Sequence, residues 1–243
     1  MTESTAIITG GSDRIGAEIC RELHRDGMNI VIHYHSSYDA ANALLNELND
    51  LRPGSAHLLN GDLAKIKSCI SLIERAFHIN QRLDLLVNNA SVFYPTPIEE
   101  ISEEKWDELT GINLRAPLFL ARAAAPYLEK NRGCIINLID IYAERPLKDH
   151  TLYCISKAGL IMLTKTLARE LGPDIRVNAI SPGAILWPDT IAEDDKKEIL
   201  SRTVLKRQGQ PADIARAVRY LFRDADYTTG QILVIDGGRS LMP

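Results

Sequence analysis

Seven short apolar runs recur along the chain, and each ends at residues that favour a turn. Nearly every position within a run is apolar, which is typical of strands that are buried on both faces of a sheet. The predicted strands cover residues 5–8, 28–34, 56–60, 83–88, 134–139, 176–180 and 232–235. Strands of this kind occur mainly in parallel sheets covered by helices, so the segments between the runs should be helical.

The intervening segments carry apolar residues at helical spacing. Ile15, Ile19 and Leu23 recur every fourth residue before Gly27. Two further segments have apolar residues at positions 41, 44, 45, 48 and 51 and at positions 66, 70, 73 and 77. The alternation predicts an α/β fold: one Rossmann-type domain over residues 1–243, with a doubly wound, seven-stranded parallel sheet and helices on both faces. Residues 184–210 have weak periodicity, and we interpret them as a substrate-loop excursion that could act as a mobile lid.

Composition and charge exclude several classes of protein. The chain has 243 residues, 25% of them charged, and a formal net charge of -4, so it has no overall field to attract nucleic acid or an acidic membrane. No apolar stretch is long enough to span a membrane and the first ten residues lack a secretory signal, so we expect a cytoplasmic protein. The cysteines at positions 20, 69, 134 and 154 form no CxxC pair, and we interpret them as reduced packing residues without a metal.

A glycine-rich turn, TGGSDRIG at residues 9–16, joins the first predicted strand to the first predicted helix. Small residues such as Gly10 let the backbone approach a pyrophosphate, and the unpaired N–H groups at the start of the helix, near Arg14 and Ile15, attract its charge. The turn therefore indicates a dinucleotide site, although a tight strand-to-helix turn without a ligand would use the same residues.

The end of the second predicted strand bears on the choice between NAD(H) and NADP(H). Its sequence is HYHSS, at residues 33–37, and no acidic residue occurs there before Asp39. An acid would hydrogen-bond a ribose 2′-hydroxyl and repel a 2′-phosphate, whereas hydroxyl, imidazole and backbone N–H groups can accept the phosphate. NADP(H) is therefore favoured. His35 is a candidate cofactor contact, and we expect His33 to pack within the strand layer.

Tyr153 and Lys157 lie four residues apart at the start of a predicted helix that runs to about residue 171. That spacing places both side chains on one face, so the hydroxyl and the ammonium group can reach one spot. A cation there stabilises the phenolate and makes the tyrosine a better acid near neutral pH. After the fifth strand of a nucleotide-binding sheet, the pair indicates a catalytic site.

Together these motifs resemble the short-chain dehydrogenase/reductase family over essentially the whole chain. Further matches follow in order: Asp62, the NNA segment that includes Asn89 and Ala90, Asn113, the turn Pro182-Gly183, and DGG at residues 236–238. The resemblance implies that Asp62 holds the adenine, that the NNA segment borders the cofactor and that the Pro-Gly turn cradles the nicotinamide. It also implies that Asn113 supports a proton relay through water.

Two departures from the family pattern narrow the assignment. Arg14 replaces the middle glycine of the usual turn, where a guanidinium can pair with the pyrophosphate and reach the substrate, unless it is only a helix-surface residue. Asp140, thirteen residues before Tyr153, stands where most of the family has a catalytic serine. Reduction of a C=N bond requires a proton on nitrogen, which a carboxyl group beside the tyrosine can help to deliver. We expect Asp140 and Tyr153 to titrate as a coupled pair, although a strand-end aspartate could also simply cap the next turn.

These departures, with HYHSS and the segment NNASVFYPTP at residues 88–97, resemble the pteridine reductases. The resemblance implies an NADPH-dependent enzyme that reduces a C=N bond of a dihydropterin; it leaves open which of dihydrobiopterin, dihydromonapterin and dihydrofolate is the substrate, and whether oxidised pterins are reduced. The implied roles are a stacking ring at Phe93, a 2′-phosphate site at His35, Ser36 and Ser37, cofactor and substrate contacts at Arg14 and Ser91, and catalysis by Asp140, Tyr153 and Lys157. Tyr94 is expected to pack within its loop.

Residues 183–188 resemble the bacterial dihydromonapterin reductase branch, and Trp187 either covers the substrate or packs in its loop. Relatives are usually tetramers built on the helices around Asn113 and Leu160 and on the C-terminus, so the resemblance implies a homotetramer. Two other functions stay open. A carbonyl reductase of the same family would act on a 3-oxoacyl or quinone substrate, and a cofactor-binding sensor would have no turnover.

Overall fold

The computed structural model describes residues 3–187 and 192–242, and within them seven parallel strands form one sheet in the order β3-β2-β1-β4-β5-β6-β7. The strands are β1 (Thr5–Ile8), β2 (Asn29–Tyr34), β3 (Ala56–Asn60), β4 (Leu85–Asn88), β5 (Cys134–Leu138), β6 (Arg176–Pro182) and β7 (Ile232–Ile235). The predicted Rossmann-type, doubly wound sheet is confirmed. Strand ends differ by up to two residues: β4 begins later than predicted, and β6 continues to Pro182.

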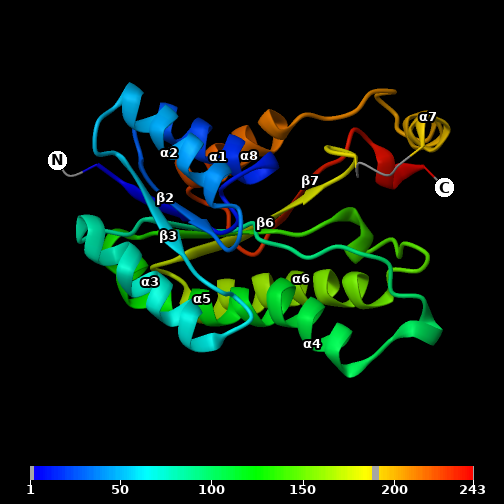
Figure 1. Cartoon of the computed structure of the whole chain (residues 1–243), viewed down its shortest axis with the longest axis horizontal. Helices are drawn as coiled ribbons and strands as arrows, with labels where there is room; N and C mark the ends of the chain where they lie inside the picture. Colours follow the sequence, from blue (N-terminus) through cyan, green and yellow to red (C-terminus); the bar gives the residue numbers. More distant parts are fainter. Residues whose placement is uncertain (1–2, 188–191, 243) are drawn as a thin grey trace.

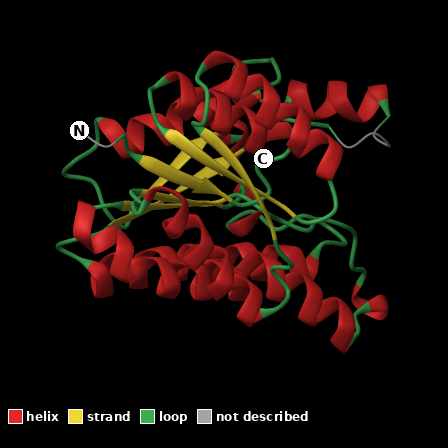
Figure 2. Ribbon diagram, turned by 60° about the vertical axis from the view of Figure 1, so that its left-hand side comes forward, coloured by secondary structure: helices red, strands yellow, loops and turns green. Residues whose placement is uncertain are grey.

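Helices cover both faces of this sheet (Figure 1, Figure 2). They are α1 (Arg14–Arg25), α2 (Tyr38–Leu51), α3 (Ile66–Asn80), α4 (Glu103–Thr110), α5 (Ala116–Leu128), α6 (Thr151–Leu171), α7 (Glu193–Ser201) and α8 (Pro211–Arg223). In Figure 1, α1, α2 and α8 lie on one side and α3, α4, α5 and α6 on the other. Within β1, Ala6 and Ile8 pack in the core beneath α1 and α8, whereas Ile7 packs in the core beneath α3 and α5. Burial on both faces explains why the strands are apolar at nearly every position.

The predicted core-facing side of α2 is buried except for its last residue, and that of α3 is only partly buried. The buried residues of α3 are Cys69, Leu72, Ile73 and Ala76. Ile66, a member of the predicted stripe, is 37% exposed. The α3 sequence has apolar residues on more than one helical stripe, so packing against the sheet and α5 selects which one is buried. In α2, Leu51 is 74% exposed because the helix ends at this residue.

The four cysteines are buried free thiols, as predicted. Burial raises the pKa of the Cys69 and Cys134 thiols to about 11, so both stay protonated near neutral pH. Among the helices in the described part of the chain, none is long and apolar enough to cross a membrane.

The sheet reverses its winding direction between β1 and β4. Strands β2 and β3 extend from one side of β1, and strands β4 to β7 extend from the other. In open sheets of this kind, ligands bind outside the carboxyl ends of the strands at the reversal. The glycine turn follows β1 and the NNA segment ends β4, so two of the predicted motifs meet at this point.

Candidate active site

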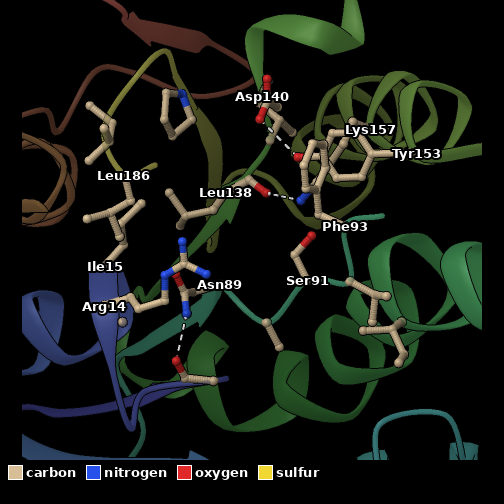
Figure 3. A pocket seen from close by; sticks show the side chains of 18 of the residues that line it. Arg14, Ile15, Asn89, Ser91, Phe93, Leu138, Asp140, Tyr153, Lys157 and Leu186 are labelled. Atoms are coloured by element: carbon tan, nitrogen blue, oxygen red, sulfur yellow. Dashed lines mark hydrogen bonds between the residues drawn. The ribbon is translucent and has the colours of Figure 1, made fainter. Parts of the chain in front are cut away.

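A cavity of about 970 Å³ opens at the carboxyl ends of the strands (Figure 3). Of the site residues predicted from the sequence, Asn113 alone does not line it. Those that do are Gly10, Arg14, Ile15, His35, Ser36, Ser37, Asp62, Asn89, Ala90, Ser91, Phe93, Asp140, Tyr153, Lys157, Pro182, Gly183 and Trp187. The fold therefore brings together motifs that are spread over nearly the whole sequence.

The glycine turn has a backbone that glycine suits better than other residues. Gly10 has a φ of +58°, and a Cβ at Gly16 would lie 2.1 Å from the carbonyl oxygen of Gly10. Arg14 also has a left-handed φ, of 50°, a conformation that disfavours residues with a Cβ by roughly 1 kcal/mol. Its side chain forms no hydrogen bond or ion pair with any described residue, and Figure 3 shows it within the cavity. A strained residue with an unpaired cation in a cavity points to a ligand role.

His33 connects the glycine turn to the end of β3. The backbone N–H of Gly10 donates to His33 Nδ1 at 3.1 Å, and the Nε2 of His33 lies 3.1 Å from the carbonyl oxygen of Gly61. Since Nδ1 accepts, the ring proton is assigned to Nε2. Burial lowers the pKa of His33 to about 4, so the ring is neutral near pH 7. His33 is thus buried in the strand layer as predicted, but the sequence did not reveal that it anchors the turn.

The turn is also fixed from β4. The Oγ1 of Thr9 accepts hydrogen bonds from the backbone N–H groups of Asn89 and Ala90, each at 3.0 Å. The side-chain amide of Asn89 donates to the carbonyls of Thr9 and Gly10, at 2.9 and 2.8 Å. The amide of Asn89 therefore holds the turn, while the N-cap residue of α1, Asp13, makes no capping hydrogen bond with its side chain. That arrangement leaves the first N–H groups of α1 available for an anion.

The far end of the cavity is polar and lies at the ends of β2 and β3. His35, Ser36 and Ser37 line it before α2 begins. Asp62 forms an ion pair with Lys65 at 3.1 Å and accepts a hydrogen bond from the N–H of Ala64 at 3.0 Å. These contacts, that with Lys65 first, lower the pKa of Asp62, so its carboxylate is ionised.

The predicted catalytic residues meet at the end of β5. The Tyr153 hydroxyl donates to Oδ2 of Asp140 at 2.9 Å, and Oδ1 of Asp140 accepts from the N–H of Tyr142 at 2.9 Å. Lys157 Nζ donates to the carbonyl of Leu138 at 2.9 Å and lies 5.7 Å from the centre of the Tyr153 ring. The 3-10 turn that Asp140 caps (Ile141–Ala143) thus coexists with its contact to Tyr153, so the capping and catalytic interpretations are compatible.

The protonation of this group follows from burial. Desolvation raises the pKa of Asp140, and burial together with the Asp140 charge raises the pKa of Tyr153 well above its ordinary value. Burial lowers the pKa of Lys157 to about 8. From the sequence we expect Lys157 to make Tyr153 more acidic, but here burial and Asp140 outweigh it. Asp140 and Tyr153 form a directly hydrogen-bonded pair of groups that both retain protons to unusually high pH.

Phe93 lies beside Tyr153. Its ring meets that of Tyr153 edge-on at 4.7 Å and stacks on His150 at 4.7 Å, with 19° between the stacked planes. Thr96 and His150 form an isolated parallel bridge, which holds their two loops together. Phe93 remains 45% exposed, so part of the ring stays open. Sequence reasoning missed His150, which also lines the cavity; its position three residues before Tyr153 was the available signal.

Tyr94 packs against a cluster that includes Leu109 of α4 and Leu152 of α6, so the prediction that it packs within its own loop was too narrow, and it also lines the cavity. Its hydroxyl donates to Oε2 of Glu108 at 2.8 Å. The residue is therefore anchored to α4, while its neighbour Phe93 meets the ring of Tyr153.

Asn113 supports the cavity wall from behind. It lies in a π-helical turn (Gly111–Arg115) between α4 and α5, where such turns often mark functional sites. Its Oδ1 accepts from the Ser91 hydroxyl at 3.2 Å and from the Val92 N–H at 2.8 Å, and its Nδ2 donates to Ser156 Oγ at 3.1 Å. The side chain is thus occupied by protein groups, and it positions the loop that carries Ser91.

The loop after β6 closes the remaining side. A Cβ at Gly183 would lie 2.6 Å from the Cβ of Asp236, so only glycine fits there. Pro182 and Trp187 line the cavity beside it. The excursion predicted over residues 184–210 includes α7, and its residues 188–191 lie outside the described part of the chain.

Comparisons with known proteins agree with this geometry. The family model described as enoyl-(acyl carrier protein) reductase matches residues 11–240. Pteridine reductase 1 of Leishmania tarentolae is 31% identical over 284 residues, which cover 99% of this chain and 97% of its own. Glucose 1-dehydrogenase 2 of Bacillus subtilis is 32% identical, with 100% and 97% covered. A 3-oxoacyl-(acyl-carrier-protein) reductase of Staphylococcus epidermidis is 33% identical, with 96% and 98% covered.

Relatives with three different substrates thus have nearly equal identity to this chain, so the comparisons identify a family rather than a substrate. The sheet order, the glycine turn and the Tyr153–Lys157 pair are all present at the expected points of the fold. The chain belongs to the short-chain dehydrogenase/reductase family of oxidoreductases.

Proposed function

We propose that this protein is an NADPH-dependent pteridine reductase. It would transfer a hydride to the carbon of a C=N bond in a dihydropterin such as dihydrobiopterin, dihydromonapterin or dihydrofolate, giving the tetrahydro form. The observation that carries the proposal is the hydrogen bond from the Tyr153 hydroxyl to Asp140, which lies beside Phe93 in the cavity. The relative named pteridine reductase 1 adds support.

The cavity fits a dinucleotide cofactor. Three features of the glycine turn suit a pyrophosphate. Gly16 has no room for a Cβ, the first N–H groups of α1 are not capped by a side chain, and Arg14 is unpaired among the described residues. We assign the 2′-phosphate to His35, Ser36 and Ser37, the adenine to Asp62, the central part to Ile15, Asn89 and Ala90, and the nicotinamide end to Lys157, Pro182 and Gly183. When bound, NADPH supplies the hydride; the protein residues bind it and manage the proton.

The substrate nitrogen requires a proton as hydride reaches the neighbouring carbon. Tyr153 is the donor in our proposal, and Asp140 replaces its proton, because the raised pKa of Asp140 keeps this carboxyl group protonated to higher pH than an ordinary aspartic acid. Lys157, held by the carbonyl of Leu138, keeps a positive charge beside the pair below about pH 8. Asn113 keeps the wall behind Ser91 in place.

Phe93 would supply one wall for the flat pterin ring. An exposed aromatic ring beside the proton donor favours a flat aromatic substrate, because stacked rings gain about 0.5–1.5 kcal/mol beyond buried area. Arg14 and Ser91 would orient the polar edge of the ring, and Trp187 would cover it.

A substrate panel tests the proposal, with NADPH and NADH as cofactors and wild-type and Asp140→Ser proteins. We expect the wild type to reduce dihydropterins with NADPH preferred, and Asp140→Ser to lower kcat/KM for dihydropterins at least about tenfold while improving reduction of a 3-oxoacyl thioester or a quinone. Unchanged dihydropterin turnover by Asp140→Ser would contradict the mechanism. Wild-type activity confined to carbonyl substrates would instead support the carbonyl reductase suggested by the 3-oxoacyl relative, and no turnover at all would support a sensor.

We further propose that the protein is a homotetramer. Leu118 of α5 and Met162 of α6 are 40% and 62% exposed, and they offer apolar surface on helices near Asn113 and Leu160. Sedimentation equilibrium measures the mass directly, and a mass of about one chain, 27.0 kDa, at micromolar concentration would rule out the tetramer.

A further inference from the structure

One cation in the cavity has no role in the function proposed above. Arg239 lines the cavity from a short 3-10 turn (Arg239–Leu241) that follows β7. Among the described residues its side chain makes no ion pair. Its one hydrogen bond, from Nη1 to the carbonyl of Arg202, is 3.5 Å long and therefore weak. Its guanidinium retains donors for a ligand.

The turn that carries Arg239 is held firmly on both sides. The carboxylate of Asp236 accepts hydrogen bonds from the N–H groups of Gly238 and Ser240, at 2.8 and 2.6 Å. Arg145 donates to the carbonyls of Ser240 and Met242, so it ties the C-terminal segment to the loop after β5. These contacts fix the backbone of the turn on which Arg239 lies.

Arg239 lies on the opposite side of Asp140 from the residues that we assign to the 2′-phosphate and the adenine. The sheet order places β7 at one edge and β3, which precedes Asp62, at the other. Figure 1 shows the C-terminal segment beside α7, and the N–H of Leu205 donates to the carbonyl of Gly237 at 3.0 Å. Burial and Asp140 raise the pKa of Tyr142, and the positive charge of Arg239 opposes that rise, so its field reaches the end of the cavity next to Asp140.

Among the described residues, no acid forms an ion pair with Arg239. Both oxygens of Asp236 accept backbone hydrogen bonds, and Glu198 is paired with Arg202 at 2.7 Å. An unpaired guanidinium in a cavity favours a carboxylate or phosphate, to which it can donate two parallel hydrogen bonds.

We propose that Arg239 binds an anionic group at the end of the substrate side chain, so that the enzyme prefers dihydropterins with a carboxylate or phosphate there. The proposal rests on the pteridine reductase function and extends it to substrate choice. The ring would react beside Tyr153 and Asp140, and its side chain would extend away from the nucleotide toward β7.

The test compares wild type, Arg239→Met, Arg239→Lys and a control, Arg202→Met, with saturating NADPH. The control removes a neighbouring guanidinium that is paired with Glu198 and does not line the cavity. The substrates are dihydrobiopterin, whose side chain is neutral, dihydrofolate, which has carboxylates, and a dihydropterin with a phosphate monoester on its side chain. Comparison of the last two substrates shows whether Arg239 binds a carboxylate or a phosphate.

We expect Arg239→Met to raise KM about tenfold or more for at least one anionic substrate, with kcat nearly unchanged, because a charge-assisted hydrogen bond is lost. Dihydrobiopterin kinetics and KM for NADPH should stay within about twofold, and Arg239→Lys should restore part of the loss. Added salt should raise the wild-type KM for the anionic substrate more than that of Arg239→Met.

Equal losses on neutral and anionic substrates, or no loss on either anionic one, would overturn the role of Arg239 while leaving the proposed function intact. A similar loss in Arg202→Met would also overturn it, because that residue lies outside the cavity. A wild type that reduces no dihydropterin would overturn both proposals.

Discussion

The ends of β3 and β5 carry two carboxylates that line one cavity but have opposite acidities. Asp62, after β3, is bound by the exposed ammonium of Lys65 and by a backbone N–H, and its pKa is lowered. Asp140, after β5, lies among Tyr153, Tyr142 and the buried Lys157, and desolvation raises its pKa. The same residue type thus has a lowered pKa in one region and a raised pKa in the other, which fits the binding role that we propose for Asp62 and the proton-transfer role that we propose for Asp140.

The two lysines differ in the same way. Lys65 is an exposed member of a surface ion pair, with its side chain 76% exposed. Lys157 is 2% exposed and has a pKa of about 8. The ammonium group of Lys65 is therefore in contact with water, whereas that of Lys157 is buried, and burial disfavours its charged form. This difference supports the assignment of binding to one end and proton transfer to the other.

The largest expected effect distinguishes the proposed role of Asp140 from that of Asp62. Asp140→Asn should lower kcat by about 100-fold or more, since proton delivery by a positioned side chain contributes about 10²–10⁴ in rate. Asp140 acts in its protonated form, so wild-type kcat should fall as pH rises through its raised pKa. Asparagine cannot ionise, so the variant should lack that dependence. Steady-state kinetics across pH measures both effects.

Asp62→Asn is the matched control, because it makes the same substitution in the other carboxyl group that lines the cavity. It should raise KM for NADPH and leave kcat with dihydropterin within about twofold. If both variants reduced kcat alike, the division of the cavity into a binding end and a proton-transfer end would be wrong.

The nucleotide end was largely predictable from the sequence because its requirements are local. The glycine turn, HYHSS and Asp62 each lie at or just after the carboxyl end of a strand. In a parallel sheet these ends lie at the same edge, so the three motifs are expected to lie close together. Helical spacing placed Tyr153 beside Lys157, and the resemblance to the family placed Asp140 with them; the structure brings Asp140 and Tyr153 into direct contact. Apolar runs predicted these strands because their residues are buried on both faces.

The contacts between loops could not be predicted. His150 reaches Phe93 only because the bridge between Thr96 and His150 joins two loops that are remote in sequence. Likewise, His33 anchors Gly10 through a hydrogen bond that depends on the register of β1, β2 and β3. The net rise of the Tyr153 pKa depends on burial, which one-dimensional spacing does not report.

The second prediction concerns how the free energy of unfolding depends on the titration of the buried Lys157. Lys157 has a pKa of about 8 in the folded protein, against an ordinary lysine value of 10.5. Between these pH values the unfolded chain binds more protons, so wild-type stability should rise with pH relative to Lys157→Met, which has no such group. The difference in unfolding free energy between the two proteins should change by roughly 3 kcal/mol from pH 7.5 to 10.5. Urea unfolding of the cofactor-free proteins at several pH values measures it.

Lys65→Met supplies the comparison at the exposed end. An exposed ion pair contributes only about 0.2–1 kcal/mol, so the difference in unfolding free energy between wild type and Lys65→Met should stay below about 1 kcal/mol throughout the same pH interval. If the difference in unfolding free energy between wild type and Lys157→Met does not change with pH, water reaches the Lys157 ammonium group in the folded protein. That result would remove the contrast between the two lysines.

The smallest expected effect tests whether NADPH binding at the glycine turn requires the side chain of Arg14 in addition to the backbone N–H groups. Arg14 and Arg132 both have a φ of 50°, but Arg132 is exposed and does not line the cavity. Replacing either by glycine should stabilise the cofactor-free protein by up to about 1 kcal/mol, because glycine adopts this φ freely. If Arg14 pairs with the pyrophosphate, only Arg14→Gly should also weaken NADPH binding, about tenfold, as measured by calorimetry. Equal NADPH affinity in the two variants would show that the turn binds through its N–H groups alone and that the left-handed arginine has no part in the site.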